Sequence, residues 1–311
     1  MDAADLRVFE SVARLGGMNR AAAELNTVQS NVTARIRALE EELGVALFRR
    51  HSRGVSLTNA GLRLLPYANR VSSLLNEAKR SVGDDDVPKG PLAIGSLETT
   101  AAQRLSPVIT MFGKANPGVS LSLKVGTNAA LVEQVLNHEL DGAFVCAPVR
   151  HPDLKSDVVF REELVVATKA DVIAIRPVVT AGCKVLVKGP GCAYRERLEG
   201  WLQDRGVSEF ERLEFGTLEA IISCVEAGLG FTMLPRSVLA DAGRAGRIRL
   251  HKLAAKDAEV ETVFIRRQDV FEFSALRAFL ACALSQSARG SGIRQLSKEE
   301  IAPIKKDRLK R

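Results

Sequence analysis

The chain has 311 residues, which exceeds the usual size of one hydrophobic core and favours two or three folding units. Its 46% hydrophobic and 26% charged residues are typical of a soluble globular protein, and no stretch reaches the roughly 18 apolar residues of a membrane-spanning helix. The first ten residues lack the apolar run of a signal peptide, so we expect a cytoplasmic protein without a membrane partner.

Basic residues gather at the two ends of the chain. Residues 1–80 carry 12 Lys and Arg against 8 Asp and Glu, a net charge of +4, and residues 287–311 carry 8 against 3, a net charge of +5. Since the total is +7, the middle of the chain carries only −2. This asymmetry fits a polyanion partner at one or both ends, although a basic surface without a partner would give the same count.

The first 44 residues show the patterns of three short helices. Apolar residues recur at helical spacing from Leu6 to Ala13, and an Ala-rich stretch at 21–25 predicts a second helix that Asn19 can cap. The third helix has an inward apolar stripe. This stripe consists of Val32, Ile36, Leu39 and Leu43.

The outward face of the third helix is small, polar and basic, whereas an ordinary surface helix favours Glu and Lys. A helix that enters the major groove of DNA needs short hydrogen-bonding side chains to read base edges, basic groups for phosphates and small residues for close approach. This pattern predicts a DNA-reading helix. Its expected DNA-binding residues are Gln29, Ser30, Asn31, Thr33, Arg35 and Arg37.

The stretch that follows, residues 46–61, reads as a hairpin wing. Phe48 and Leu57 flank a basic bend that contains a glycine. We expect Arg49, Arg50 and Arg53 to meet phosphates or a minor groove. A wing can be basic merely because it is exposed, but its place directly after a reading helix favours DNA.

Residues 21–61 also carry a specific pattern, AA-x-x-L…Q-S-x-V-T-x-x-I-x-x-LE-x-x-LG-x-x-LF-x-R…LT-x-AG. It resembles the N-terminal domain of LysR-type transcriptional regulators. The resemblance implies a sequence-specific regulator rather than an enzyme, with double-stranded promoter DNA as its partner, and it leaves RNA polymerase open as a further partner. One departure is Val28, where the family often has a capping Ser or Thr, so the cap either passes to Thr27 or is weak.

From Thr58 the chain reads as one long helix to about residue 82. Its apolar residues form a heptad seam, which has to be buried against another surface. We expect a second copy of the chain to cover it, the alternative being the chain's own effector domain. The seam consists of Leu64, Ala68, Val71, Leu75 and Ala78. In the family, such dimers usually pair into tetramers through their effector domains.

Beyond residue 90, short apolar runs alternate with helical patterns in two sets. Two such sets predict two α/β lobes with largely parallel sheets. Strands are expected at 91–96, 121–125, 142–146, 164–167, 185–187 and 231–234, and helices at 99–114, 129–140, 194–205 and 220–227. This organisation is similar to the LysR effector domain, which shares its fold with periplasmic solute-binding proteins.

We therefore expect an α/β protein with an N-terminal all-α winged helix-turn-helix, a linker helix and a two-lobed effector domain like the periplasmic binding proteins. The expected boundaries are 1–58 for the DNA-binding domain, 59–90 for the linker, 91–286 for the effector domain and 287–311 for a flexible basic tail. Lobe I comprises 91–161 and 267–286, and lobe II comprises 162–266, with hinge segments at 161–164 and 262–266.

In folds of this kind, ligands bind beyond the carboxyl ends of strands and beside helix N-termini. Four motifs have that position: GSLETT at 95–100, GTNA at 126–129, GPGCAYR at 189–195 and FGTLE at 215–219. The resemblance implies these effector-contacting residues: Ser96, Thr99, Thr100, Thr127, Phe144, Cys192 and Phe231. Helix capping explains any single polar residue among them equally well.

A small organic anion is the effector that these helix N-termini favour. Arg195 is the nearest cation in the motifs, and a neutral polar ligand is the alternative. The chain has no GxxxxGKS, no GxGxxG after a strand and no HExxH, so we expect neither a cofactor nor a metal.

Two other functions compete with a ligand-responsive regulator. One is a redox-sensing regulator of the same build, switched by Cys183 and Cys192, which lie near the cysteine pair of peroxide-sensing members of the family. The other is an enzyme or solute-binding protein with an unrelated N-terminal bundle, which the lack of a signal peptide and of a nucleophile–base motif disfavours.

Overall fold

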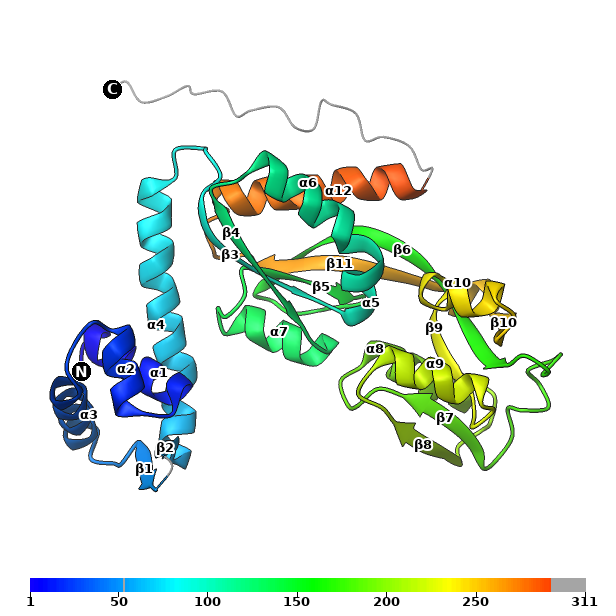
Figure 1. Ribbon diagram of the computed structural model, residues 1–311, viewed down its shortest axis with the longest axis horizontal. Helices are drawn as coiled ribbons and strands as arrows, with labels where there is room; N and C mark the ends of the chain where they lie inside the picture. Colours follow the sequence, from blue (N-terminus) through cyan, green and yellow to red (C-terminus); the bar gives the residue numbers. More distant parts are fainter. Residues whose placement is uncertain (53, 292–311) are drawn as a thin grey trace.

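The computed structural model describes residues 1–52 and 54–291, and shows an N-terminal helical unit, a long helix and a two-lobed α/β domain (Figure 1). The N-terminal unit follows the predicted order of three helices, a hairpin and a long helix. Its elements are α1 (Ala3–Leu15), α2 (Met18–Glu24), α3 (Gln29–Leu43), β1 (Phe48–His51), β2 (Gly54–Leu57) and α4 (Asn59–Gly83).

The ends of these helices have identifiable causes. A capping box of Asp2 and Asp5 begins α1. By contrast, α2 begins after Gly17 without a side-chain cap, so the predicted capping by Asn19 is wrong. The N-cap of α3 is Val28, which offers no side-chain acceptor. Of the two alternatives that the sequence left open, the structure therefore shows the weak cap. The Thr58 side chain caps α4 as predicted.

The core of the N-terminal unit lies between α1, α3 and the first half of α4. Phe9, Ile36 and Leu39 are buried there, and Ala68 of α4 is fully buried against them. Leu64 and Val71 pack on the same core. The predicted seam is therefore not uniformly exposed, because Ala68 is buried and Leu64 and Val71 are half-buried within the chain's own N-terminal unit.

The two-lobed domain begins with β3 (Gly90–Ser96). Lobe I continues with α5 (Glu98–Thr100), the π-helical turn η1 (Ala101–Leu105), α6 (Ser106–Ala115), β4 (Val119–Val125), α7 (Asn128–Leu136) and β5 (Gly142–Cys146), and is closed by α12 (Ser274–Ser291). Lobe II contains β7 (Cys183–Val187), α8 (Ala193–Gln203), β8 (Phe210–Glu214), α9 (Leu218–Glu226), β9 (Thr232–Pro235), α10 (Arg236–Arg244), β10 (Ile248–Lys252) and α11 (Ala255–Ala258).

Two long strands, β6 (Leu154–Lys169) and β11 (Glu259–Arg267), pass between the lobes side by side (Figure 1). They pair antiparallel, and their register shifts between Thr262 and Val263, inside one of the predicted hinge segments. The sheet order is β10-β6-β11-β5-β3-β4, with β9 also paired to β6.

The prediction of largely parallel sheets is correct only for part of each lobe. β3 pairs in parallel with β4 and β5, and β7 pairs in parallel with β8. The ladders of β6 with β9, β10 and β11, and of β11 with β5, are antiparallel. The two strands that cross between the lobes cause this. The chain enters lobe II along β6 and returns along β11, so these two neighbouring strands run in opposite directions.

Helix α12 covers lobe I and runs to Ser291. Residues 287–291 of the predicted flexible tail are therefore helical, so that boundary is wrong, and the remaining tail residues lie outside the described ranges. Arg53 of the predicted wing also lies outside them. Among the helices of the described ranges, none combines the length and the apolar character needed to cross a membrane.

Candidate DNA-reading face and effector cleft

Helix α3 separates its core residues cleanly from an outward face. Val32 and Ile36 are at most 1% exposed, whereas Gln29, Ser30 and Asn31 are exposed at the first turn. Arg37 is exposed about two turns further along. Because the inward side chains are fixed in the core, the outward ones are presented by a rigid helix, which is the geometry that base reading needs.

The polar groups of this face are preorganised by bonds along the helix. Gln29 Nε2 donates to Thr33 Oγ1 at 3.2 Å, and Asn31 Nδ2 donates to Thr27 Oγ1 at 3.0 Å. Thr33 itself is half-buried. Both bonds are local and exposed, so a base edge can replace them.

Arg35 differs from the other predicted residues of α3. Its guanidinium donates to Asp5 Oδ1 at 2.8 Å and lies 4.0 Å from Asp2. This arginine therefore links α3 to the start of α1, and the DNA interface that we propose does not include it.

The wing is held in place by the end of the same helix. Glu40 Oε1 accepts hydrogen bonds from the backbone N–H groups of Leu47 (2.7 Å) and Phe48 (3.1 Å). Arg49 and Arg50 follow on β1, and both are exposed. Within the described residues, neither guanidinium forms a salt bridge, so both remain free to neutralise phosphates.

The two lobes meet at α8 and at the loop that precedes it, where three polar contacts cross between them. Thr99 Oγ1 lies 3.2 Å from the hydroxyl of Tyr194, and Lys188 forms an ion pair with Glu98. Arg197 Nη2 donates to the carbonyl oxygen of Ala147 at 2.9 Å. The structure thus shows the lobes closed on each other at the predicted cleft.

The predicted hydroxyl residues have different environments at this contact. Ser96 Oγ donates to its neighbour's carbonyl, and Thr127 Oγ1 accepts from Ala130 N and caps α7. Thr100 is fully buried, and its Oγ1 has no hydrogen-bond partner in the described structure. A buried hydroxyl without a partner is costly, so Thr100 is the member of the set whose placement most needs a ligand to explain it.

Two predicted cleft residues are buried in hydrophobic cores. The ring of Phe144 lies 4.9 Å from that of Phe264 and 5.9 Å from that of Phe160, inside lobe I. Phe231 is fully buried in the other core, and its backbone pairs with the strand β7. The assignment of Phe144 is wrong, because its ring packs on Phe279 of α12 inside lobe I rather than towards the other lobe. The assignment of Phe231 stays a prediction, since its core includes Tyr194 and residues of both lobes.

The predicted cation of the cleft is also corrected. Arg195 is bound by the carboxylates of Glu199 (2.9 Å) and Glu214 (2.6 Å), so its charge is already neutralised. Arg197, which the sequence patterns did not single out, reaches the other lobe and forms no salt bridge within the described ranges. The sequence signal that could have identified Arg197 as a residue facing the other lobe is its position three residues after Tyr194, on the same face of α8.

A buried carboxylate completes the site. Glu162 Oε1 accepts from Arg104 Nε at 3.4 Å and from Ser237 Oγ at 3.2 Å, whereas Glu162 Oε2 is buried without a partner. Burial raises the pKa of the Tyr194 hydroxyl, so this tyrosine stays protonated and acts as a hydrogen-bond donor or acceptor. The contact region therefore offers both unused donors and an unused acceptor.

The two cysteines of the redox alternative do not meet in this structure. Cys183 begins β7, and Cys192 is the N-cap of α8 beyond the other end of that strand. A strand of this length spans about 13 Å, whereas a disulfide needs Cα atoms within about 7 Å. Burial also raises the pKa of the Cys183 thiol, which disfavours the reactive thiolate. In the described part of the chain, no group of three or more His, Cys, Asp or Glu is placed to hold a metal ion.

Two family models match the chain and together cover most of it. The model described as "Bacterial regulatory helix-turn-helix protein, lysR family" matches residues 3–62, and the "LysR substrate binding domain" matches residues 85–288. Among known relatives, the HTH-type transcriptional regulator YusT of Bacillus subtilis strain 168 is 46% identical over 280 residues, which cover 90% of this chain and 94% of that protein. The regulator GltR of the same organism is 43% identical over 278 residues, with 88% and 93% covered.

Solved structures show the same fold at low identity. A full-length OxyR from Pseudomonas aeruginosa superposes with a TM-score of 0.69 at 22% identity, covering 93% of this chain and 95% of that chain. Full-length CbnR in complex with its target DNA superposes with a TM-score of 0.64, also at 22% identity, covering 92% of this chain and 100% of that chain.

Proposed function

The chain belongs to the LysR family of transcriptional regulators, and on that premise we propose that it recognises specific promoter sequences and that a small effector bound between its lobes modulates this binding. We propose no catalytic role, and the partner is double-stranded DNA. The single observation that carries the proposal is the outward face of α3, where Gln29, Ser30, Asn31 and Arg37 are exposed above a fully packed core.

The side chains of this face suit the major groove. A glutamine or asparagine amide can form two hydrogen bonds with an adenine, and a serine hydroxyl accepts or donates to several base edges. We therefore assign sequence discrimination to the first turn of α3. The wing arginines contribute affinity rather than discrimination, because phosphates carry no sequence information.

The test compares Arg50→Ala with Lys114→Ala in the full chain. Both variants lose one exposed positive charge, but Lys114 lies on α6 of lobe I, far from the reading helix along the chain. Arg50→Ala should weaken binding to every duplex alike and lower the slope of log affinity against log salt by about 1. Equal affinity and salt slope for Arg50→Ala and wild type would exclude the wing from the interface.

The effector that fits the cleft is a small organic anion that also carries a hydrogen-bond donor. Arg197 supplies the cation for the anionic end, and Thr100 Oγ1 supplies a buried hydroxyl. The free oxygen of Glu162 accepts from a donor group at the other end of the ligand. A ligand that binds the closed and open lobes with different affinity shifts the equilibrium between them, typically by a coupling of about 1–3 kcal/mol.

We further propose that the chain forms homodimers through α4, and tetramers through its effector domains. Apolar side chains on α4 that the N-terminal core leaves uncovered include Tyr67 (67% exposed), Leu74 (49%) and Val82 (91%). Leu75 and Ala78 of the predicted seam are exposed as well. The second half of α4 together with Tyr67, rather than the whole predicted seam, is the surface that a second copy would cover.

A further inference from the structure

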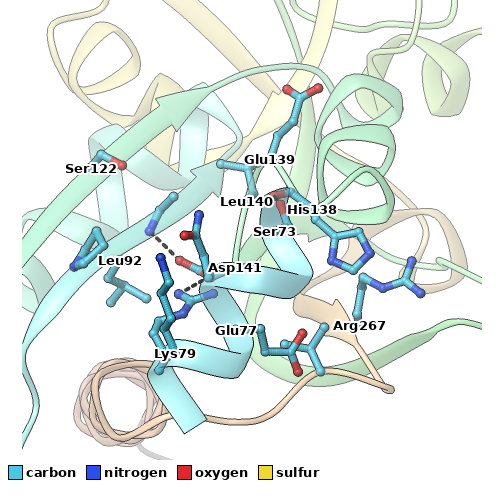
Figure 2. A pocket seen from close by; sticks show the side chains of 15 residues that line it. Ser73, Glu77, Lys79, Leu92, Ser122, His138, Glu139, Leu140, Asp141 and Arg267 are labelled. Carbon is cyan, nitrogen blue, oxygen red and sulfur yellow. Dashed lines mark hydrogen bonds and ion pairs between the residues drawn. The ribbon is translucent and has the colours of Figure 1, made fainter. Parts of the chain in front are cut away.

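The second half of α4 lies against lobe I and leaves a cavity of about 420 Å³ between them (Figure 2). We call this contact, from Ser73 to Asp86 on one side and lobe I on the other, the linker joint. Most of the residues that line it are polar, and they include Lys79 and Glu77 from α4 and His138 and Asp141 from lobe I.

The centre of the joint is an ion pair between distant parts of the chain. Arg80 Nη1 lies 2.8 Å from Asp141 Oδ1, and the same guanidinium stacks 4.2 Å above the ring of Phe273. About two helical turns earlier, Ser73 Oγ donates to the carbonyl oxygen of His138 at 3.0 Å.

The carboxylates of α4 and of the segment after it hold the start of α12. Glu77 accepts from the backbone N–H of Phe271 at 2.7 Å, and Asp84 accepts from that of Ser274 at 2.9 Å. The joint is thus closed by hydrogen bonds and ion pairs.

Apolar packing contributes little to the joint. The residues of α4 that belong to a hydrophobic core end at Val71, and that core is the one of the N-terminal unit. The two other cores of the described structure contain no residue of α4. A contact held by partly exposed polar pairs is weak compared with an apolar core of similar extent.

The joint also buries polar groups that it does not satisfy. Arg80 Nε and His138 Nε2 are both buried and have no hydrogen-bond partner among the described residues. His138 in addition has a left-handed backbone conformation with φ of 59°, a region in which asparagine, aspartate and histidine are enriched among the residues other than glycine. Opening the joint would return both nitrogens to water, which lowers the free-energy cost of opening.

Two strands connect the joint directly with the effector cleft. Asp141 directly precedes β5, and its Oδ2 accepts from the backbone N–H of Ala93 on β3 at 2.8 Å. At their other ends, β3 leads to Thr99 and Thr100, and β5 leads to the carbonyl of Ala147 that Arg197 contacts. Since paired strands are stiff over such a short length, a shift at the cleft moves the residues that hold α4.

We propose that the linker joint is a latch that opens and closes with the effector cleft and so transmits ligand binding to the DNA-binding unit. This inference rests on the proposed function, and it says through which contacts a bound effector would regulate DNA binding. With the latch closed, α4 and the N-terminal unit are fixed relative to lobe I. With the latch open, the helix is free to turn on residues 83–90, and the spacing of two reading helices in a dimer changes.

The first experiment measures amide hydrogen exchange at Phe271 and Ser274 in the full chain. Arg80→Gln should accelerate exchange at both amides at least tenfold, because the carboxylates that accept from them move away with α4. Lys79→Gln is the matched control, since it removes a neighbouring charge that makes no ion pair in the described structure, and it should leave exchange unchanged. Wild-type exchange in Arg80→Gln would overturn the latch.

Exchange of the buried β5 amides reports whether Arg80→Gln is still folded. If exchange of the β5 amides also accelerates, Arg277→Gln replaces Arg80→Gln as the test of the latch. Arg277 lies 2.8 Å from Asp86 at the exposed end of the joint. It should accelerate exchange at Ser274 at least threefold, and an unchanged rate in this variant would overturn the latch.

The second experiment tests the connection to the cleft. Lys188→Gln breaks the ion pair with Glu98 between the lobes, and it should change exchange at Phe271 and Ser274 at least threefold. Lys184→Gln is its control, because Lys184 pairs with Glu211 within lobe II. No change at the joint in Lys188→Gln would overturn the proposed transmission. Neither experiment contains DNA, so a failure of the chain to select DNA sequences would overturn the proposed function and leave these results standing.

Discussion

The proposed DNA-reading face and the proposed effector cleft present their polar side chains in opposite ways. On α3 these groups are exposed, and the residues that fix them, such as Ile36 and Leu39, form a separate buried layer. In the cleft, Thr100 and Glu162 are themselves buried, and each keeps a polar atom without a partner. The exposed groups of α3 therefore leave the stability of their unit unaffected. In the closed cleft, the buried polar atoms without partners lower the stability but are available to bind a ligand.

The largest effect should come from Phe144, which the sequence placed in the cleft and the structure places in the core. Phe144→Ala should lower the free energy of unfolding by about 3–5 kcal/mol, because it leaves a cavity among three phenylalanine rings. Denaturant unfolding measures this loss. A loss below about 1 kcal/mol would contradict the core assignment and return Phe144 to the cleft.

The two halves of α4 offer a second contrast. Leu74→Glu places a charge on the exposed half, and it should weaken dimerisation about a hundredfold while the monomer keeps its stability, because Leu74 is 49% exposed in the single chain. Light scattering at graded concentrations measures the dimer. Arg63→Glu, on the exposed surface of the first half, is the control for added charge. An unchanged dimer in Leu74→Glu would exclude this surface.

Thr99 and Thr100 are neighbours with opposite expectations. Thr100→Val removes a buried hydroxyl that has no partner, so it should raise the free energy of unfolding by about 1 kcal/mol and abolish the response to effector. Thr99→Val removes a hydroxyl that lies 3.2 Å from that of Tyr194, and it should lower the free energy of unfolding by about 1 kcal/mol. Equal effects of the two substitutions would refute the distinction between them.

The smallest effect concerns His138 at the linker joint. Burial, followed by the charge of Arg267, lowers the pKa of this imidazole, with Asp269, Arg70 and Glu77 as the other charged groups that act on it. The folded protein therefore disfavours the protonated ring, and its stability should decline as the pH falls below about 6.5, the ordinary histidine pKa. Unfolding measurements at pH 7.5 and 5.5 should show a smaller decline in His138→Gln. An identical decline would mean that other groups cause it.

The contrast between the two regions also explains what the sequence could predict. The face of α3 follows from the spacing of Val32, Ile36 and Leu39, since a helix with one buried stripe has only one opposite side. The strand β5 is buried at every position, so no alternation in the sequence reveals which way Phe144 points. Contacts such as that of Arg197 with Ala147 depend on how two lobes meet, and no local pattern encodes that.

Similar reasons account for the errors on α4. The heptad spacing predicted correctly that the helix has an apolar side. It could not indicate which surface covers that side, and Ala68 packs on the chain's own N-terminal core. The pair of Arg80 and Asp141 joins residues 61 positions apart in sequence, and neither residue stands in a motif. Both features are properties of packing between units, which local periodicity does not determine.

The central claim, that the outward face of α3 reads base edges, is tested most directly by selecting preferred duplexes from a random DNA library with wild type, Gln29→Ala and Gln203→Ala. Gln203 ends α8 in lobe II, so that variant controls for the substitution itself. We expect Gln29→Ala to lose about 1–3 kcal/mol of discrimination at one or two base pairs of each half-site, and Gln203→Ala to select the wild-type sequence. An unchanged sequence preference in Gln29→Ala would contradict the account.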